Sequence, residues 1–203
     1  MKITGYILFT AILLSLTSCA EEKDPIPKPR GYFHIQFPDK EYKPSEIDCP
    51  VNFDQPTNTV ILDQESKSLT NCFKNLYYPR YGATIYLSYF PVSDNLSEIN
   101  LDMQDKVYEH RNMASGILES QYANIEKKVF GTTYELMGDA AVNYLFYLTD
   151  STDNYFVGQL FFDCAPNYDS LQPVINHIKV DIEHLIETFE WKNPAIQLEF
   201  MDQ

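Results

Sequence analysis

Residues 72–90 read CFKNLYYPRYGATIYLSYF, two runs of aromatic and β-branched residues with a short break between them. This composition predicts a strand–turn–strand unit. In the second run the apolar residues fall at every other position, Ala83, Ile85, Leu87 and Tyr89. Such alternation is typical of a sheet with one wetter face, so the stretch predicts an antiparallel sheet.

Further strands are predicted on both sides of this unit. Upstream, strand composition occurs at residues 31–37, 51–53 and 59–62. Downstream, three antiparallel strands are predicted at residues 127–136, 140–149 and 155–162. The last two are joined across a polar turn, Asp150-Ser151-Thr152-Asp153.

Two helices are predicted among these strands. The first begins at Asn95, which with Glu98 has the spacing of a capping box. Its apolar positions recur every four residues and then less regularly: Ile99, Met103, Val107, Met113 and Ile117. The second helix is predicted over residues 168–189, with an apolar stripe of Val174, Ile178, Ile182, Leu185 and Phe189.

The order of these elements predicts an α+β fold, a mainly antiparallel sheet packed with two helices. This coarse topology resembles the PsbP/Mog1 type of sandwich, an analogy of element order that carries no function with it. We expect a single α+β domain at residues 31–192 and a short C-terminal tail at residues 193–203.

The N-terminus has the pattern of a lipoprotein signal peptide at residues 1–18. Lys2 precedes an apolar run from Tyr6 to Leu16, which is too short to span a bilayer. The run closes with Leu16-Thr17-Ser18-Cys19, a lipobox in which the Cys19 thiol accepts the lipid. Residues 20–30, AEEKDPIPKPR, predict a semi-rigid tether behind the anchor. We therefore expect a membrane-anchored protein.

The charge balance limits the classes of partner. With 29 acidic and 15 basic residues the net charge is −14. A nucleic-acid partner is not expected, because phosphate binding needs a basic face. An acidic surface also repels anionic headgroups, so the N-terminal lipid must provide the membrane contact.

Three cysteines remain after lipidation: Cys49, Cys72 and Cys164. Export to an oxidising compartment permits one disulfide among three pairings. Of these we favour Cys49 with Cys72, and we expect Cys164 to be a free, at least partly buried thiol. A metal site on these thiols is disfavoured because there is no C-x-x-C pair and no histidine at ligand spacing.

No catalytic constellation is evident, and we expect neither enzymatic activity nor a cofactor. The sequence has no G-x-S-x-G elbow and no phosphate-binding glycine loop. His177, Asp181 and His184 share one strip of the last helix, where a metal would be geometrically feasible. They lie beside the apolar stripe, so we predict a solvated flank.

The segment Tyr77-Tyr78-Pro79-Arg80-Tyr81 is the most suggestive binding feature. Tyrosine and arginine anchor many protein interfaces, so Tyr77, Tyr78, Arg80 and Tyr81 are candidate interface residues. The alternative interpretation is a turn whose tyrosines cover the edge of the core.

The sequence also resembles the GldD family of gliding-motility lipoproteins of Bacteroidota. The resemblance lies in PKPRGYFHIQFP at residues 27–38, Cys49-Pro50, residues 72–89, and PNYDSLQPVINHIKVDIEHLIETFEWK at residues 166–192. It implies a non-enzymatic, lipid-anchored envelope protein required for gliding and for the associated type IX secretion machinery. It also implies the Cys49–Cys72 pairing and leaves Cys164 unpaired.

The partners implied by this resemblance are other gliding and secretion envelope proteins. We expect the domain to face the periplasm, with the cell surface as the alternative. Two other functions remain open at this point: a small-ligand-binding lipoprotein, and an enzyme that modifies envelope polymers.

Overall fold

A computed structural model describes residues 35–64 and 72–192 of the chain. These residues all belong to the second of the two compact units into which the chain divides, residues 34–203. The predicted signal peptide, Cys19 and tether, and the predicted tail at residues 193–203, lie outside the described residues.

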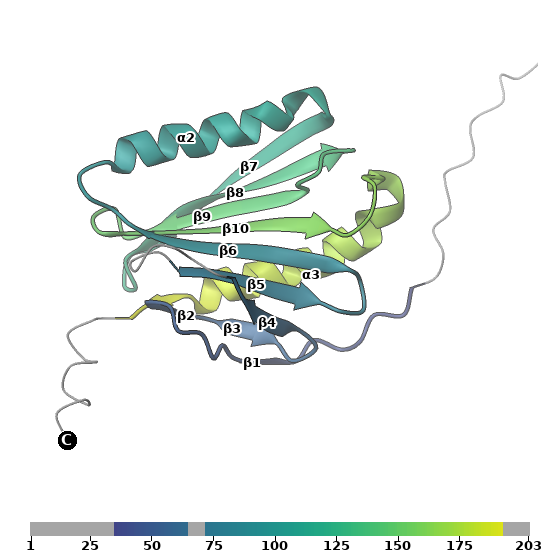
Figure 1. Ribbon diagram of the computed structural model, residues 1–203, viewed down its shortest axis with the longest axis horizontal. Helices are drawn as coiled ribbons and strands as arrows, with labels where there is room; N and C mark the ends of the chain where they lie inside the picture. Colours follow the sequence, from purple (N-terminus) through teal and green to yellow (C-terminus); the bar gives the residue numbers. More distant parts are fainter. Residues whose placement is uncertain (1–34, 65–71, 193–203) are drawn as a thin grey trace, which may run out of the picture. The chain divides into compact units, whose positions relative to one another are not determined.

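A seven-stranded antiparallel sheet forms the centre of this unit (Figure 1), in the order β4-β5-β6-β10-β9-β8-β7. The strands are β4 Val60–Asp63, β5 Cys72–Tyr78, β6 Ala83–Pro91, β10 Asn154–Phe162, β9 Tyr144–Thr149, β8 Val129–Gly138 and β7 Ala114–Asn124. Two meanders, β4-β5-β6 and β7-β8-β9-β10, are joined where β6 pairs with β10. The predicted antiparallel sheet is thus confirmed.

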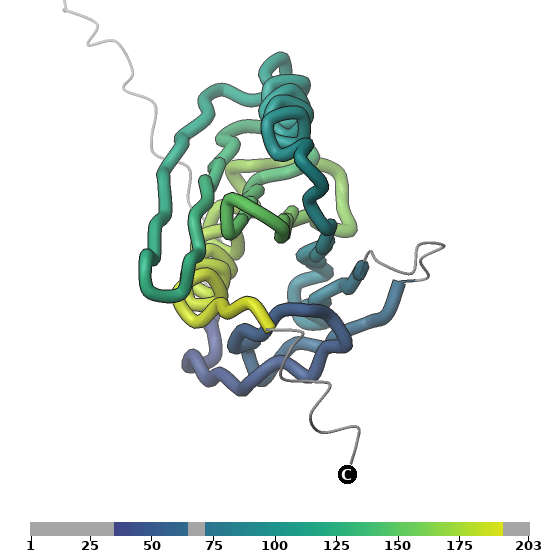
Figure 2. Tube along the Cα trace, turned by 90° about the vertical axis from the view of Figure 1, so that its left-hand side faces the viewer, coloured from purple at the N-terminus to yellow at the C-terminus, as the bar shows by residue number. Residues whose placement is uncertain are grey.

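Two helices cover opposite faces of the sheet, α2 at Leu96–Glu109 and α3 at Tyr168–Thr188 (Figures 1 and 2). Consecutive residues of β10 show the division: Tyr155 and Val157 join the cluster under α2, whereas Phe156 joins the cluster under α3. Both clusters consist of buried apolar side chains, and a fully buried aliphatic side chain contributes roughly 1.5–3 kcal/mol. The α+β fold class is therefore as predicted, with one helix on each face.

The apolar stripe predicted on the last helix is the part of α3 that faces the sheet. All its residues are buried: Val174, Ile178, Ile182, Leu185 and Phe189. The helix begins after Asn167, whose side chain accepts a hydrogen bond from the Ser170 backbone N–H (3.3 Å). This cap satisfies one of the free N–H groups of the first turn.

Two small sheets lie on the α3 side of the unit. Strand β1, Tyr42–Pro44, pairs with β3, Asp54–Pro56. Strand β2, Val51–Asn52, pairs with β11, Glu190–Trp191, directly after α3. Of these, the prediction had placed a strand only at residues 51–53.

The predicted continuation of the first helix through Met113 and Ile117 is wrong. Helix α2 ends at Glu109, the short 3-10 helix η1 spans His110–Asn112, and β7 follows. Met113 is 62% exposed, so its place in the helical pattern was coincidental. Ile117 packs against the same cluster as α2, but from the sheet.

Two smaller predictions near the chain's other elements are also wrong. Residues 35–37 form no strand, and residues 31–34 of that predicted strand lie outside the described residues. Asn95 makes no side-chain cap on α2, because its Oδ1 instead accepts from the Ser93 backbone N–H (3.0 Å).

Candidate functional site

Cys49 and Cys72 form a disulfide, as predicted, with their Cα atoms 5.7 Å apart. The bond ties the segment before β2 to the first residue of β5, and so holds the small sheets to the large one. Cys164 is free but exposed, so the prediction of its burial is wrong. It lies in the loop after β10, where the chain has already left the sheet.

The segment that follows the predicted tether lies along α3, and we call its residues 35–44 the strap. Two aromatic rings of the strap stack on histidines of the helix. Phe37 lies on His177 with ring centroids 4.3 Å apart, and Tyr42 lies on His184 at 3.7 Å. The strap is thereby fixed at two points, about two turns of helix apart.

Between these two points the strap neutralises a buried carboxylate. Asp181 is only 3% exposed. Its Oδ1 accepts from Lys40 Nζ at 2.7 Å and from the Tyr42 hydroxyl at 3.0 Å. Lys40 also donates to the backbone carbonyl of His177 at 2.7 Å. A buried charge needs such partners, because its solvation by water has been lost.

The groups around Asp181 have shifted pKa values. Burial of Lys40 lowers its pKa, although the hydrogen bond to Asp181 and the charge of Asp181 oppose the shift. Burial and the negative charge of Asp181 raise the pKa of Tyr42. Burial and the positive charge of Lys40 lower the pKa of His177, so the uncharged ring is favoured. The cluster is thus a tyrosine–lysine–carboxylate network beside a neutral histidine.

The prediction that His177, Asp181 and His184 form a solvated flank is wrong. The strap covers this side of α3, which a pattern confined to the helix does not reveal. Within residues 35–64 and 72–192, no group of three His, Cys, Asp or Glu side chains is placed to hold a metal ion.

The four predicted interface residues lie in three different places. Tyr78 is 1% exposed and lies in the core under α3. Arg80 donates to the Gln36 carbonyl of the strap at 2.8 Å, and the Tyr81 ring lies 5.6 Å from His177. Tyr77 lies on the opposite face of the sheet from Tyr78, since successive strand residues alternate. Their contact with another protein stays a prediction.

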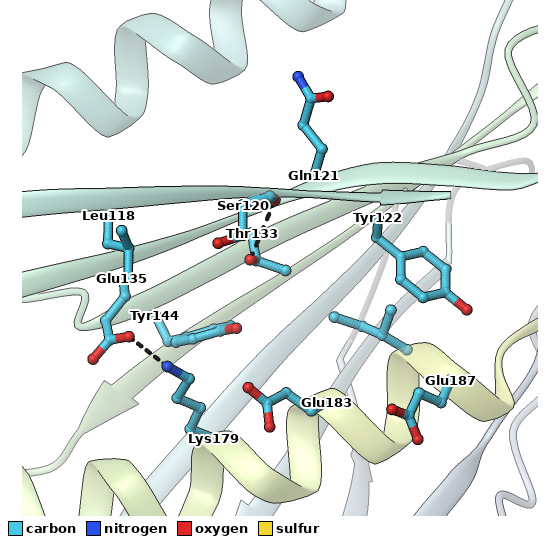
Figure 3. A pocket seen from close by; sticks show the side chains of 11 residues that line it. Leu118, Ser120, Gln121, Tyr122, Thr133, Glu135, Tyr144, Lys179, Glu183 and Glu187 are labelled. Carbon is cyan, nitrogen blue, oxygen red and sulfur yellow. Dashed lines mark hydrogen bonds and ion pairs between the residues drawn. The ribbon is translucent and has the colours of Figure 1, made fainter. Parts of the chain in front are cut away.

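A second site, which the sequence did not reveal, lies between the sheet edge and α3 (Figure 3). It is a pocket of about 210 Å³, and we call it the β7 groove. Its wall is formed by β7 and β8 and its floor by α3; the lining includes Leu118, Ser120, Tyr122, Tyr144, Ile186 and Glu187. Leu118, Ser120 and Tyr122 stand at every second position of the sequence, as residues on one face of a strand do. The strand was not predicted there, because the first helix was expected to continue through Ile117.

The groove is acidic. Figure 3 shows Glu183 and Glu187 directed into it from α3. Lys179 donates to Glu135 at 2.6 Å, and this hydrogen bond raises the pKa of Lys179. Lys179, a cation of the lining, is therefore paired with Glu135, while the carboxylates of Glu183 and Glu187 face the open space.

In the part of the chain that the structure describes, no helix has the length and apolarity needed to cross a bilayer. The lipid attachment predicted at Cys19 lies outside that part.

Three comparisons relate the chain to known proteins. A family model described as gliding motility lipoprotein GldD matches residues 22–191. No curated protein matches the sequence. Among solved structures, the solution structure of cyanobacterial PsbP (CyanoP) from Synechocystis sp. PCC 6803 is similar, with 8% identity and a TM-score of 0.47. The similarity covers 76% of this chain and 94% of that one.

Proposed function

Since the chain belongs to the GldD family of gliding motility lipoproteins, we propose that it acts by binding other proteins of the gliding and type IX secretion machinery, and not by catalysis. The family match carries this proposal. It begins three residues after Cys19 and ends at the last residue of β11, so it covers most of the proposed tether and all the described helices and strands. The protein is a lipid-anchored component of the cell envelope that takes part in gliding motility.

Cys19 is the proposed lipid attachment site, and residues 20–30 the tether to the domain at residues 31–192. The strap begins five residues after the end of the proposed tether in the sequence, and it is held on α3 by Lys40 and Asp181. The strap therefore fixes the first described residues of the domain to α3. A protein that docks with membrane-bound neighbours benefits from this arrangement, because a short tether raises its effective concentration near them.

The buried and partly buried carboxylates of the domain are paired with other side chains of the domain, and this supports a binding function. Asp181 is satisfied by Lys40 and Tyr42, and Glu135 by Lys179, so these carboxylates act as structural partners. Within the described residues a cluster of buried apolar side chains lies between the sheet and each helix, and the β7 groove lies at the edge of the sheet. This favours surface contacts over the binding of a small ligand in the interior.

A gene deletion tests the proposal. Cells without the protein should neither spread nor secrete type IX cargo, and the wild-type gene should restore both. Crosslinking in the complemented cells should then capture other envelope proteins. Normal spreading and secretion in the deletion strain would contradict the function, and an enzymatic activity lost with the protein would contradict the mode of action.

A further inference from the structure

We propose that the β7 groove is the docking site for an extended, basic segment of another envelope protein, which joins the sheet as a strand beside β7. The inference rests on the proposed function and deepens it, since it assigns the contact surface and the chemistry of the partner. The edge of the sheet, the direction of the side chains and the charge of the groove each support it.

Strand β7 is an open edge of the sheet. It pairs with β8 on one side, and among the described strands nothing pairs with its other side. It is also the longest described strand, with 11 residues. Edge strands are usually protected by lysine, proline or inward-pointing charge. Residues 114–124, ASGILESQYAN, contain neither lysine nor proline, and their one charge is Glu119.

The groove lies where the side chains of an added strand would point. Leu118, Ser120 and Tyr122 occupy alternate positions of β7 and face α3 (Figure 3). Alternate side chains of a neighbouring strand would point the same way, into the space above Ile186. Leu118 is 53% exposed and would be covered by such a strand.

The charge of the groove selects a basic occupant. Glu183 and Glu187 face the groove, and Lys179 is held by Glu135. Lys127, which is not part of the groove lining, is paired with Glu190 at 3.1 Å and donates to the backbone carbonyl of Glu187 at 3.5 Å. Lysine or arginine side chains on the added strand would therefore meet two carboxylates that form no salt bridge within the described residues, although the charge of Glu183 acts on the nearby Lys179.

The same charge disfavours two other occupants. The chain's own residues 193–203, NPAIQLEFMDQ, contain Glu199 and Asp202 and no basic residue. A second copy of β7 would bring Glu119 and no cation, together with a second pair of groove carboxylates. Like charges brought together in this way oppose association.

A synthetic peptide of about ten residues that alternates lysine with valine is the probe, and the full lipidated protein in non-ionic detergent is the receptor. The peptide should bind, and added salt should weaken binding through screening. A peptide with glutamate in place of lysine should not bind. Equal binding of the two peptides would overturn the proposal.

Strand addition is tested by N-methylating the peptide at alternate residues, in two versions that are offset by one position. A strand paired with one neighbour directs alternate N–H groups toward it. One version should therefore lose binding and the other should retain it. Equal binding of both versions would contradict strand addition.

The groove is tested by the double variant Glu183→Gln, Glu187→Gln. It should bind the lysine peptide about tenfold more weakly, because two exposed ion pairs are lost. The matched control, Glu98→Gln with Glu109→Gln on exposed positions of α2, removes the same charge and should bind like the wild type. Equal losses in the two variants would place the binding elsewhere.

Two alternative occupants give distinct results. Sedimentation of the unliganded protein as a dimer, with the β7 amides protected from exchange, would assign the edge to a second copy. If the chain's own basic tether occupied the groove, it would compete with the peptide. The triple variant Lys23→Gln, Lys28→Gln, Arg30→Gln would then bind the peptide more strongly than the wild type. Either result overturns the proposal.

In cells the Glu183→Gln, Glu187→Gln variant should remain at the membrane but fail to support spreading. Normal spreading with this variant would overturn the groove as a docking site and leave the motility function intact. If the proposed motility function were wrong, the deletion strain itself would spread normally. The two outcomes are therefore distinguishable.

Discussion

Asp181 and Lys40 form a partly buried ion pair although they lie 141 positions apart in the chain. The Lys40 side chain is 26% exposed, whereas that of Asp181 is 2% exposed, so water reaches only one end of the pair. Removing one partner of such a pair leaves the other charge without compensation, and this costs more than replacing both partners together.

The variant Asp181→Ala should therefore lower the free energy of unfolding by about 3 kcal/mol, measured by urea denaturation. It removes the acceptor of the Tyr42 hydroxyl and the charged partner of Lys40, which keeps only its hydrogen bond to the His177 carbonyl. The double variant Lys40→Met, Asp181→Leu should lose less, since no charge remains. A greater loss in the double variant would show that packing, and not charge, holds the strap.

Because the pKa of His177 is lowered in the folded protein, we expect the stability to depend on pH. Burial and the charge of Lys40 lower its pKa from the ordinary value of 6.5. The unfolded chain therefore binds a proton more readily than the folded protein, and the free energy of unfolding should fall as the pH decreases through about 6.5. The fall should level off below the folded-state pKa.

Urea denaturation between pH 5 and pH 8 measures this dependence. The variant His177→Gln should show a smaller slope near pH 6, because the group that gains the proton on unfolding is gone. The control His110→Gln, in η1, also removes a histidine and should keep the wild-type slope. Identical slopes for the wild type and His177→Gln would contradict the assignment.

Gly158 lies directly opposite Phe146 in the pairing of β10 with β9. The Phe146 ring occupies the place that a β-carbon at position 158 would take. The variant Gly158→Ala should therefore destabilise the protein by about 1–3 kcal/mol, as overpacking usually does. Adding Phe146→Leu should recover part of the loss, and thermal unfolding of the two variants measures both effects. An unchanged Tm for Gly158→Ala would contradict this packing.

At the scale of elements, the disulfide joins the layer of small sheets to β5. Its cysteines are 23 residues apart, and closing a loop of this length contributes about 3 kcal/mol. The variant Cys49→Ser, Cys72→Ser should lose about that amount of stability and should no longer respond to reductant. The control Cys164→Ser replaces an exposed thiol and should unfold like the wild type.

The predictions made from residue periodicity succeeded where one element continues without interruption. Strand β5 and helix α3 have almost the predicted bounds, because each is one uninterrupted element, of seven and 21 residues. Periodicity failed at residues 110–118, where a helix, a turn and a strand follow one another within a few residues. Met103 and Val107 of α2 and Ile117 of β7 pack in the same cluster, so the spacing of Ile117 continued the helical pattern although it belongs to a strand.

At the scale of the whole molecule, the lipid anchor and the folded unit have separate roles. The variant Cys19→Ala should not be acylated and should leave the membrane, while its Tm should match that of the natural protein. Gliding should fail, because the folded protein is no longer held near its partners. Retention of both acylation and motility would contradict Cys19 as the anchor. A lowered Tm would show that the lipid contributes to folding.

The sequence by itself indicated the antiparallel sheet, the two helices and the resemblance to the gliding lipoproteins, and it favoured Cys49 with Cys72 among three possible pairings. The sheet, the helices and the resemblance follow from side-chain periodicity and from short motifs, which are local properties of the chain. Only the tertiary structure decided that the strap covers Asp181, that Tyr78 is buried while Arg80 holds the strap, and that β7 forms an open edge above α3. Each of these depends on which distant segments meet, and that is set by the packing of whole faces, on which a local pattern carries no information.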